Sequence, residues 1–199
     1  MHQPEGLGRD PRRQLGPPTR GRPTSAPGFL DGALTWLTGG HRGDACGGCG
    51  YRWDTPPETA LGLVADAPAR YAALLAGRDG MAAPDDGGWN ATAYVWHLVD
   101  LARSWAERWA QIEAAPGSRL VGWDPDVLAE ARGYRRLATA AALWALPEAV
   151  DAFVRATRRV GLDARFDHAD WGAGCVADAV VWLAHEFTHH QLDVAARAR

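Results

Sequence analysis

Apolar residues recur at helical spacing along most of this chain. In "TPPETALGLVADAPARYAALLAG", residues 55–77, leucine, valine and tyrosine fall on one face of a helix. Pro68 interrupts the segment, and proline removes a backbone donor and clashes with the preceding turn. The pattern predicts a helix that is split or kinked near residue 68.

Three later segments share this periodicity. The clearest is "WNATAYVWHLVDLARSWAERWAQIEAA", residues 89–115, with an apolar residue every three to four positions. Residues 127–160 predict a helical region interrupted near Gly133, with Pro147 starting a new helix. Residues 176–198 are apolar on several sides and predict a deeply packed helix, whereas no segment alternates as a strand would. Four long helices predict an all-α fold, an antiparallel four-helix bundle.

The chain before residue 55 differs in composition from the helical segments that follow it. Residues 1–28 contain six prolines and five glycines with few apolar residues, so they cannot offset the entropy of ordering and are expected to be disordered. Residues 29–54 predict a short helix followed by the turn "CGGCG", a small cysteine-containing knuckle. The expected organisation is therefore a tail at 1–28, this segment at 29–54, and the bundle at 55–199.

Charge and cysteine content narrow the functional class. The net charge is −3, and residues 1–28 carry five arginines against Glu5 and Asp10, which leaves an acidic body. Such a body is unsuited to binding phosphate backbones, so no nucleic-acid partner is expected. No apolar run is long enough for a membrane span and no secretory signal is visible. With only three cysteines, we expect a cytoplasmic protein that acts on a small molecule, with no membrane partner.

The residues with the clearest chemistry lie in "HEFTHH", residues 185–190. His185 and His189 are four positions apart on a helix, so their side chains leave one face close enough to hold one ion. His97 lies beside the apolar stripe of the 89–115 helix and should point inward. An inward imidazole needs a partner, and two helices that supply three histidines predict a metal site.

The same letters also match the H-E-x-x-H signature of zinc proteases. An extended protease motif would require glycine at 192 and histidine at 195, where this chain has Leu192 and Ala195. Only ten residues follow His189, and no strand is expected that could hold a peptide substrate. Proteolysis is therefore disfavoured.

Two stretches resemble the DinB/YfiT-like superfamily of metal-dependent four-helix bundles. "WNATAYVWHLVD" is similar to the second-helix histidine of that family, which is followed three residues later by aspartate, and "AHEFTHHQLDV" is similar to its fourth-helix H-x-x-x-H. The lead-in "DHADWGAGCVADAVVW" also resembles the family, and the likeness spans about residues 55–195.

The resemblance implies a site and an activity. His97, His185 and His189 would hold a divalent ion, zinc or nickel, with water in the remaining positions. Characterised relatives are S-transferases and isomerases that use a low-molecular-weight thiol as co-substrate, bacillithiol or mycothiol. All 21 basic residues are arginine, a bias typical of high-GC genomes such as those of actinobacteria, and mycothiol is the thiol of actinobacteria. Bundles of this kind often pair, so a homodimer is an additional expectation.

Several residues could support the three ligands. Asp100, one turn after His97, could accept a hydrogen bond from an imidazole, and Glu186, His190 and Asp193 share a neighbouring face of the last helix. Glu186 and His190 could equally form a surface pair. Five of the ten tryptophans lie near helix starts or the expected ligands and could line a substrate cleft; they are Trp89, Trp96, Trp123, Trp171 and Trp182.

Two other functions remain open. The histidines could tie two helices together in a non-catalytic, stress-linked binding module. A metal-dependent hydrolase would use Glu186 as general base, but Glu186 is rotated by about 100° from His185 around the helix.

The knuckle raises a separate question. Cys46 and Cys49 resemble half of a structural zinc site, and His41 is the nearest further donor; His168 and Cys175 could contribute only if the fold brought them close. A metal-free turn and a redox pair are the alternatives.

Overall fold

The computed structural model describes residues 44–199, and its helices follow the predicted apolar stripes. The first helical segment is split as expected, into α2 (Pro57–Ala65) and α3 (Ala67–Leu75), with Pro68 in the first turn of α3. The predicted amphipathic helix is α4 (Ala91–Ala114), which begins at Asn90, whose side chain accepts a hydrogen bond from the backbone N–H of Ala93. The expected tail at 1–28 and the expected short helix before the knuckle lie outside the described residues.

The third helical region contains three elements. α5 (Pro125–Arg132) ends at Gly133, which has a φ of 65°, and a 3-10 turn at Tyr134–Arg136 follows. α6 (Thr139–Val160) then continues through Pro147, so the expectation of a new helix at this residue was wrong. The contact between α6 and α4 is the most extensive between any two elements described. This packing outweighs the loss of the backbone N–H at Pro147.

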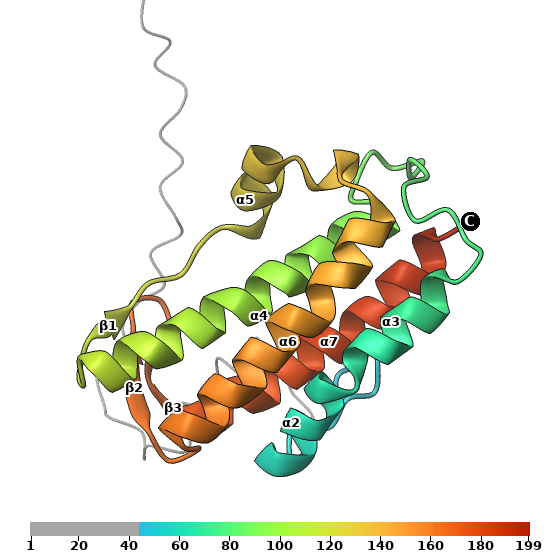
Figure 1. Ribbon diagram of the computed structural model, residues 1–199. Helices are drawn as coiled ribbons and strands as arrows, with labels where there is room; N and C mark the ends of the chain where they lie inside the picture. The colour runs from blue at the N-terminus through green and yellow to red at the C-terminus, as the bar shows by residue number, and fades with distance from the viewer. Residues whose placement is uncertain (1–43) are drawn as a thin grey trace, which may run out of the picture.

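The four-helix bundle consists of the α2–α3 pair, α4, α6 and α7 (Val176–Arg197), as the sequence predicts (Figure 1). Two helices run in each direction. The hydroxyls of Thr92 and Thr139 lie 2.6 Å apart at the starts of α4 and α6, and Arg159 donates to Glu113 near their ends, so α4 and α6 run parallel. The long crossover that contains α5 makes this arrangement possible.

A small sheet closes one end of the bundle. β1 (Arg119–Leu120) pairs in parallel with β2 (Arg165–His168), which pairs antiparallel with β3 (Gly172–Cys175). Strands were not expected from the sequence, and here two to four residues each suffice because the sheet only braces the crossover and the entry into α7. Phe166 of β2 packs against the buried rings of Trp105 and Trp109.

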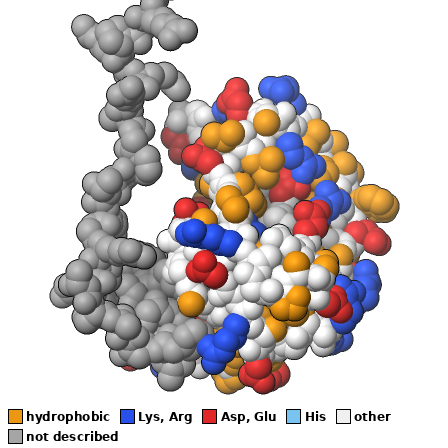
Figure 2. Space-filling model, turned by 90° about the vertical axis from the view of Figure 1, so that its left-hand side faces the viewer, with side chains coloured by type: hydrophobic (Ala, Val, Ile, Leu, Met, Phe, Trp, Pro, Cys, Tyr) orange, Lys and Arg blue, Asp and Glu red, His pale blue; other side chains and the backbone are white. Residues whose placement is uncertain are grey.

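The core is formed by aromatic and aliphatic side chains between the four helices. Trp105, Trp109, Tyr71 and Phe153 are fully buried, and Trp109 donates from its indole N–H to the Thr157 hydroxyl at 3.0 Å. On the face drawn in Figure 2, basic and acidic side chains are interspersed with hydrophobic ones. Among the described residues, no helix is long and apolar enough to cross a membrane.

Candidate metal centre

Helix α7 carries two pairs of potential metal ligands, and the second pair is offset from the first by one residue. His185 and His189 form the first pair, and Glu186 and His190 form the second. Successive residues are rotated by about 100° around a helix, so the two pairs face different neighbours. The first pair meets the Cys46–Cys49 turn, whereas the second meets α4.

His97 of α4 lies with the second pair. One potential ligand atom from each of His97, Glu186 and His190 lies within 4.8 Å of the other two. The resemblance implied that His97 lies together with His185 and His189. In the structure, Glu186 and His190 lie beside His97 instead. Two imidazoles and one carboxylate are a donor set found in catalytic zinc sites.

Asp193 fixes the orientation of His190. Its carboxylate lies 2.7 Å from Nδ1 of the imidazole, which leaves Nε2 facing Glu186 at 3.4 Å. Burial lowers the pKa of His190, but hydrogen bonds to Asp193 and Glu186 raise it to about 9. Burial also raises the pKa of Glu186, yet His185 and His190 hold it far below its usual range. The carboxylates thus favour positive charge at His190, and a bound ion would displace the proton that the imidazole carries at neutral pH.

His97 is buried among aromatic rings. Its ring centroid lies 5.3 Å from those of Trp89 and His190 and 5.9 Å from that of Trp123. Burial lowers its pKa to about 4, so the imidazole is neutral and can act as a ligand at neutral pH. Its Nδ1 is buried and makes no hydrogen bond within the part of the chain that the structure describes. Such an orphaned buried nitrogen fits a bound ion.

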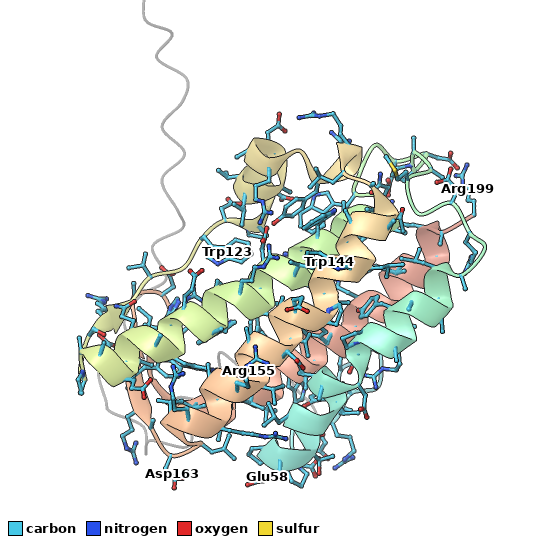
Figure 3. All side chains as sticks on the ribbon, viewed as in Figure 1. Glu58, Trp123, Trp144, Arg155, Asp163 and Arg199 are labelled. Atoms are coloured by element: carbon cyan, nitrogen blue, oxygen red, sulfur yellow. The ribbon has the colours of Figure 1, made fainter. Side chains whose placement is uncertain are left out.

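The cluster opens onto a cavity of about 360 Å³. Trp123, from the crossover before α5, lies over α4 on this side of the bundle (Figure 3). Four of the five tryptophans that the sequence suggested for a cleft line it, and Trp96 does not. The lining residues are Trp89, His97, Leu101, Arg108, Gly122, Trp123, Pro125, His168, Trp171, Trp182, Glu186 and His190.

Two donors lie on the cavity wall besides the cluster of His97, Glu186 and His190. Arg108 is buried, donates to the Val121 carbonyl at 2.7 Å, and stacks over the Trp105 ring. His168 is fully buried, and its Nδ1 accepts from the Asp170 N–H at 3.2 Å, so the proton is on Nε2. Within residues 44–199 this Nε2 has no hydrogen-bond partner. The wall thus offers a cationic group and a free N–H to a ligand.

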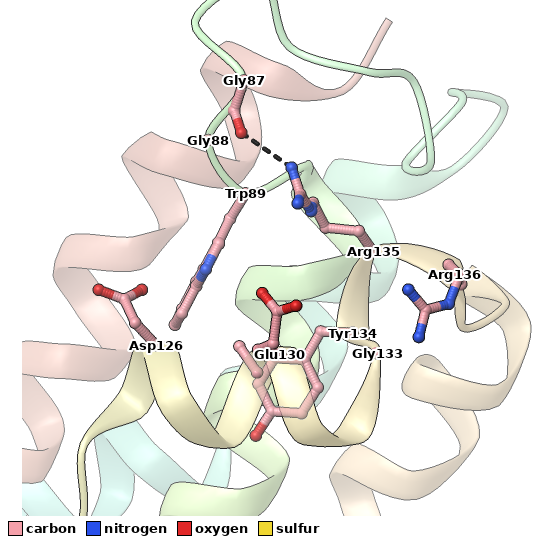
Figure 4. Close-up of a pocket in the computed structure, with 10 residues that line it drawn as sticks. Gly87, Gly88, Trp89, Asp126, Glu130, Gly133, Tyr134, Arg135 and Arg136 are labelled. Atoms are coloured by element: carbon pink, nitrogen blue, oxygen red, sulfur yellow. Dashed lines mark hydrogen bonds between the residues drawn. The ribbon is translucent and has the colours of Figure 1, made fainter. Parts of the chain in front are cut away.

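A second, more polar pocket of about 260 Å³ lies beside Trp89 (Figure 4). Asp126 and Glu130 of α5 lie on one side of it, and Arg135 donates to the Gly87 carbonyl at 2.8 Å across its rim. Because Trp89 lines both pockets, the two pockets are neighbours.

Asp100 occupies a different position from the one expected. It accepts hydrogen bonds from Arg132 and from the Tyr134 hydroxyl and lies 4.0 Å from Arg103, so it is not the partner of an imidazole. Tyr134 in turn contacts the ring of Trp89, with centroids 6.0 Å apart. Asp100 therefore anchors the α5 region beside the cavity.

The first pair on α7 lies with the knuckle. Ligand atoms of Cys46, Cys49, His185 and His189 all lie within 4.8 Å of one another. His41, the expected third donor for the cysteines, is outside the described residues. Cys175 donates to Asp178 at 3.1 Å at the start of α7, and His168 lies in the cavity wall, so neither joins the knuckle.

The sequence did contain a signal that the donors of α7 divide between two clusters. "HEFTHH" includes two overlapping i, i+4 pairs, and a C-x-x-C turn that lacks two ligands matches the H-x-x-x-H spacing of two-cysteine, two-histidine sites. Assigning His185 and His189 to the cysteines would have left Glu186 and His190 for His97.

Comparison with known proteins supports the fold. A scan against protein-family models and a search of curated proteins found no significant match. Among solved structures, the chain is similar to YfiT from Bacillus subtilis, described as a probable metal-dependent hydrolase with an unusual four-helix bundle topology, with a TM-score of 0.59 and 18% identity over 71% of this chain and 86% of that chain. At this level of identity the likeness shows that the chain has the four-helix bundle fold of YfiT.

Proposed function

We propose that this protein is a metal-dependent enzyme in which His97, Glu186 and His190 hold one divalent ion, zinc or nickel. The observation that carries the proposal is the placement of this three-donor cluster at the wall of the tryptophan-lined cavity. Three protein ligands leave positions open for a substrate or nucleophile, which distinguishes a working metal site from a structural one. The description of YfiT as probably metal-dependent is consistent with this proposal.

The residues of the chain have separate tasks in this proposal. An ion bound here would lower the pKa of a coordinated thiol or water, so that either serves as a nucleophile near neutral pH. Asp193 holds His190 in place, and the tryptophans exclude bulk water from the cavity. Arg108 and the Nε2–H of His168 bind an acceptor or anionic group of the substrate. The substrate class is thus a small molecule with an apolar body and an acidic or carbonyl group.

For the reaction, we propose transfer or isomerisation that uses a low-molecular-weight thiol of the mycothiol type. The resemblance of the segments around His97 and His190 to thiol-dependent relatives supports this choice. Hydrolysis is the second candidate, because YfiT is described as a probable hydrolase. Glu186 lies among the metal donors, so a hydrolase reaction would need a different general base.

Metal analysis combined with product analysis tests the proposal. The purified full-length protein is compared with His97→Ala and His190→Ala by plasma mass spectrometry, with the exposed Asp151→Asn of α6 as control. We expect each histidine variant, but not the control, to lose one equivalent of metal. Unchanged metal content in both histidine variants would refute the site.

The nucleophile is identified in the same preparations. An apolar electrophile with a carboxylate is incubated with the loaded enzyme and mycothiol, and the products are analysed by mass spectrometry. A thiol adduct or thiol-dependent isomer supports the proposed reaction. Cleavage of the substrate by water, independent of thiol, would establish hydrolysis instead.

A further inference from the structure

The proposed enzyme site leaves four clustered donors unused. Cys46, Cys49, His185 and His189 bring their ligand atoms within 4.8 Å of one another, and none of them belongs to the cluster with His97. All four are buried or partly buried. Two of them come from the turn before α2 and two from the last helix, so the cluster joins segments that are about 140 residues apart.

The turn has the backbone of a metal-binding knuckle. Ala45 and Arg52 form an antiparallel bridge, and the N–H of Cys46 donates to the Tyr51 carbonyl at 2.8 Å. The N–H of Gly50 donates back to the Cys46 carbonyl at 2.8 Å, and Gly50 has a φ of 74°. This closed turn holds both thiols on one side, facing α7.

One ligand–ligand distance fits a tetrahedral ion. Zinc bonds of about 2.3 Å to sulfur and about 2.0–2.1 Å to nitrogen place the two ligand atoms about 3.5–3.6 Å apart when the angle is tetrahedral. The distance between Cys46 Sγ and His189 Nδ1 is 3.5 Å. The same separation also suits a thiol–imidazole hydrogen bond, and loss of that proton would leave the two atoms placed to share one ion.

His185 supplies a further indication. Both of its ring nitrogens are buried without a hydrogen-bond partner in the described part of the chain, and its Nδ1 lies 3.3 Å from Glu186 Oε1 without hydrogen-bond alignment. Trp53 packs on its ring at 4.5 Å and Tyr51 at 5.8 Å, which keeps water away. Buried imidazole nitrogens that make no aligned hydrogen bond are costly, and an ion bound to one of them would remove that cost.

We propose that Cys46, Cys49, His185 and His189 form a second, structural zinc site. Two thiolates and two imidazoles fill a tetrahedral shell, so no position remains for a substrate. Each thiol releases its proton to solvent on binding, and thiolate ligands favour zinc over harder ions. The ion links the knuckle to α7 and does not depend on the ion that we propose at His97.

The structural ion would also set the position of the enzyme site. His185 and His189 alternate along α7 with Glu186 and His190. Fixing the first pair against the knuckle fixes the rotation of α7 about its axis, and this rotation decides whether the second pair faces α4. The two sites are therefore coupled through one helix while having separate ligands.

Cobalt substitution tests the ligand set directly. Full-length protein is loaded with Co²⁺, because thiolate ligands give sulfur-to-cobalt charge-transfer absorption and a tetrahedral site gives intense visible bands. We expect both features in the wild type and in Cys175→Ser, the matched control with a cysteine outside the cluster. Both features should be lost or strongly shifted in Cys46→Ser, Cys49→Ser and His185→Ala.

The His97→Ala variant separates this proposal from the proposed function. It should keep the thiolate–cobalt spectrum, whether or not the enzyme site exists. A wild-type cobalt protein without thiolate absorption would overturn the structural site. So would a thiolate spectrum that persists unchanged in His185→Ala and His189→Ala, since other residues would then complete the shell.

A measurement on the wild type alone tests the proposal even if the variants fail to fold. An organomercurial reagent is titrated into the zinc-loaded protein while a metal-binding dye reports released zinc. We expect zinc to appear as the knuckle thiols are modified. Blocking of all three thiols without zinc release, or a Cys46–Cys49 disulfide in freshly purified protein, would contradict the proposal.

Discussion

The carboxylate of Asp193 determines which nitrogen of His190 is available to an ion. It lies 2.7 Å from Nδ1, so Nε2, which lies 3.4 Å from Glu186, is the nitrogen left for an ion. Removing such a partner from a ligating histidine typically weakens metal binding about 10–100-fold. We expect this loss of affinity in Asp193→Asn, measured by competition with a chelating dye. Asp151→Asn is the control, and equal affinities of the two variants would show that Asp193 does not orient the ligand.

Gly48 is a sensitive position in the knuckle. A Cβ atom there would lie 2.9 Å from His189 Cε1, whereas a Cβ on the adjacent Gly47 would meet nothing within 4 Å. A ring held by zinc cannot move aside freely, so overpacking should cost about 1–3 kcal/mol. We expect Gly48→Ala to bind zinc at the knuckle about tenfold more weakly or worse, while Gly47→Ala binds normally. Calorimetric titration of both variants in a His97→Ala background measures this, and identical affinities would refute the close packing.

The sequence predicted which residues take part in the site better than it predicted which of them lie together. His97, Glu186, His190 and Asp193 were all identified as candidates, and the structure places them within one cluster region. Which of the two pairs on α7 faces His97 depends on the rotation of the helix against its neighbours. The spacing between residues 185 and 190 is the same for both assignments, so the pattern did not discriminate between them.

Among the elements, α6 contains an unusual proline. Pro147 is exposed and lies in the middle of the helix, where it removes a backbone hydrogen bond. Because little packing would be lost, Pro147→Ala should raise the free energy of unfolding by about 1–3 kcal/mol. Urea denaturation measures the change, with the neighbouring exposed Glu148→Ala as control. Lower stability of Pro147→Ala would mean that the core requires the local bend.

Helices were more predictable than strands for a physical reason. α4 presents a continuous apolar stripe over 24 residues, which a period of 3.6 identifies without other information. β2 and β3 are four residues each, and β3 reads "GAGC", which has no apolar alternation. The two strands pair because the end of α6 and the start of α7 bring them together, and this cannot be read from the local sequence.

In the whole molecule, α7 is the element on which the proposals converge. It contacts α2, α3 and α4, and its side chains contribute to both donor clusters. Tyr71 of α3 donates to the Phe187 carbonyl at 2.8 Å, within the turn of α7 that carries both ligand pairs. If both proposals hold, this helix would let a small bundle place a working ion and a structural ion close together without shared ligands.

Metal removal should therefore destabilise the entire bundle, even when the enzyme site is absent. In His97→Ala, only the knuckle ion is expected to remain, and zinc at about a thousand times its Kd stabilises the folded state by about 4 kcal/mol. For a chain of this size that corresponds to a Tm decrease of roughly 8–16 °C when an excess of chelator is added. Differential scanning calorimetry measures it. The triple variant Cys46→Ser/Cys49→Ser/His97→Ala should show no response to chelator, and a Tm of His97→Ala that is independent of chelator would contradict a stabilising ion at the knuckle.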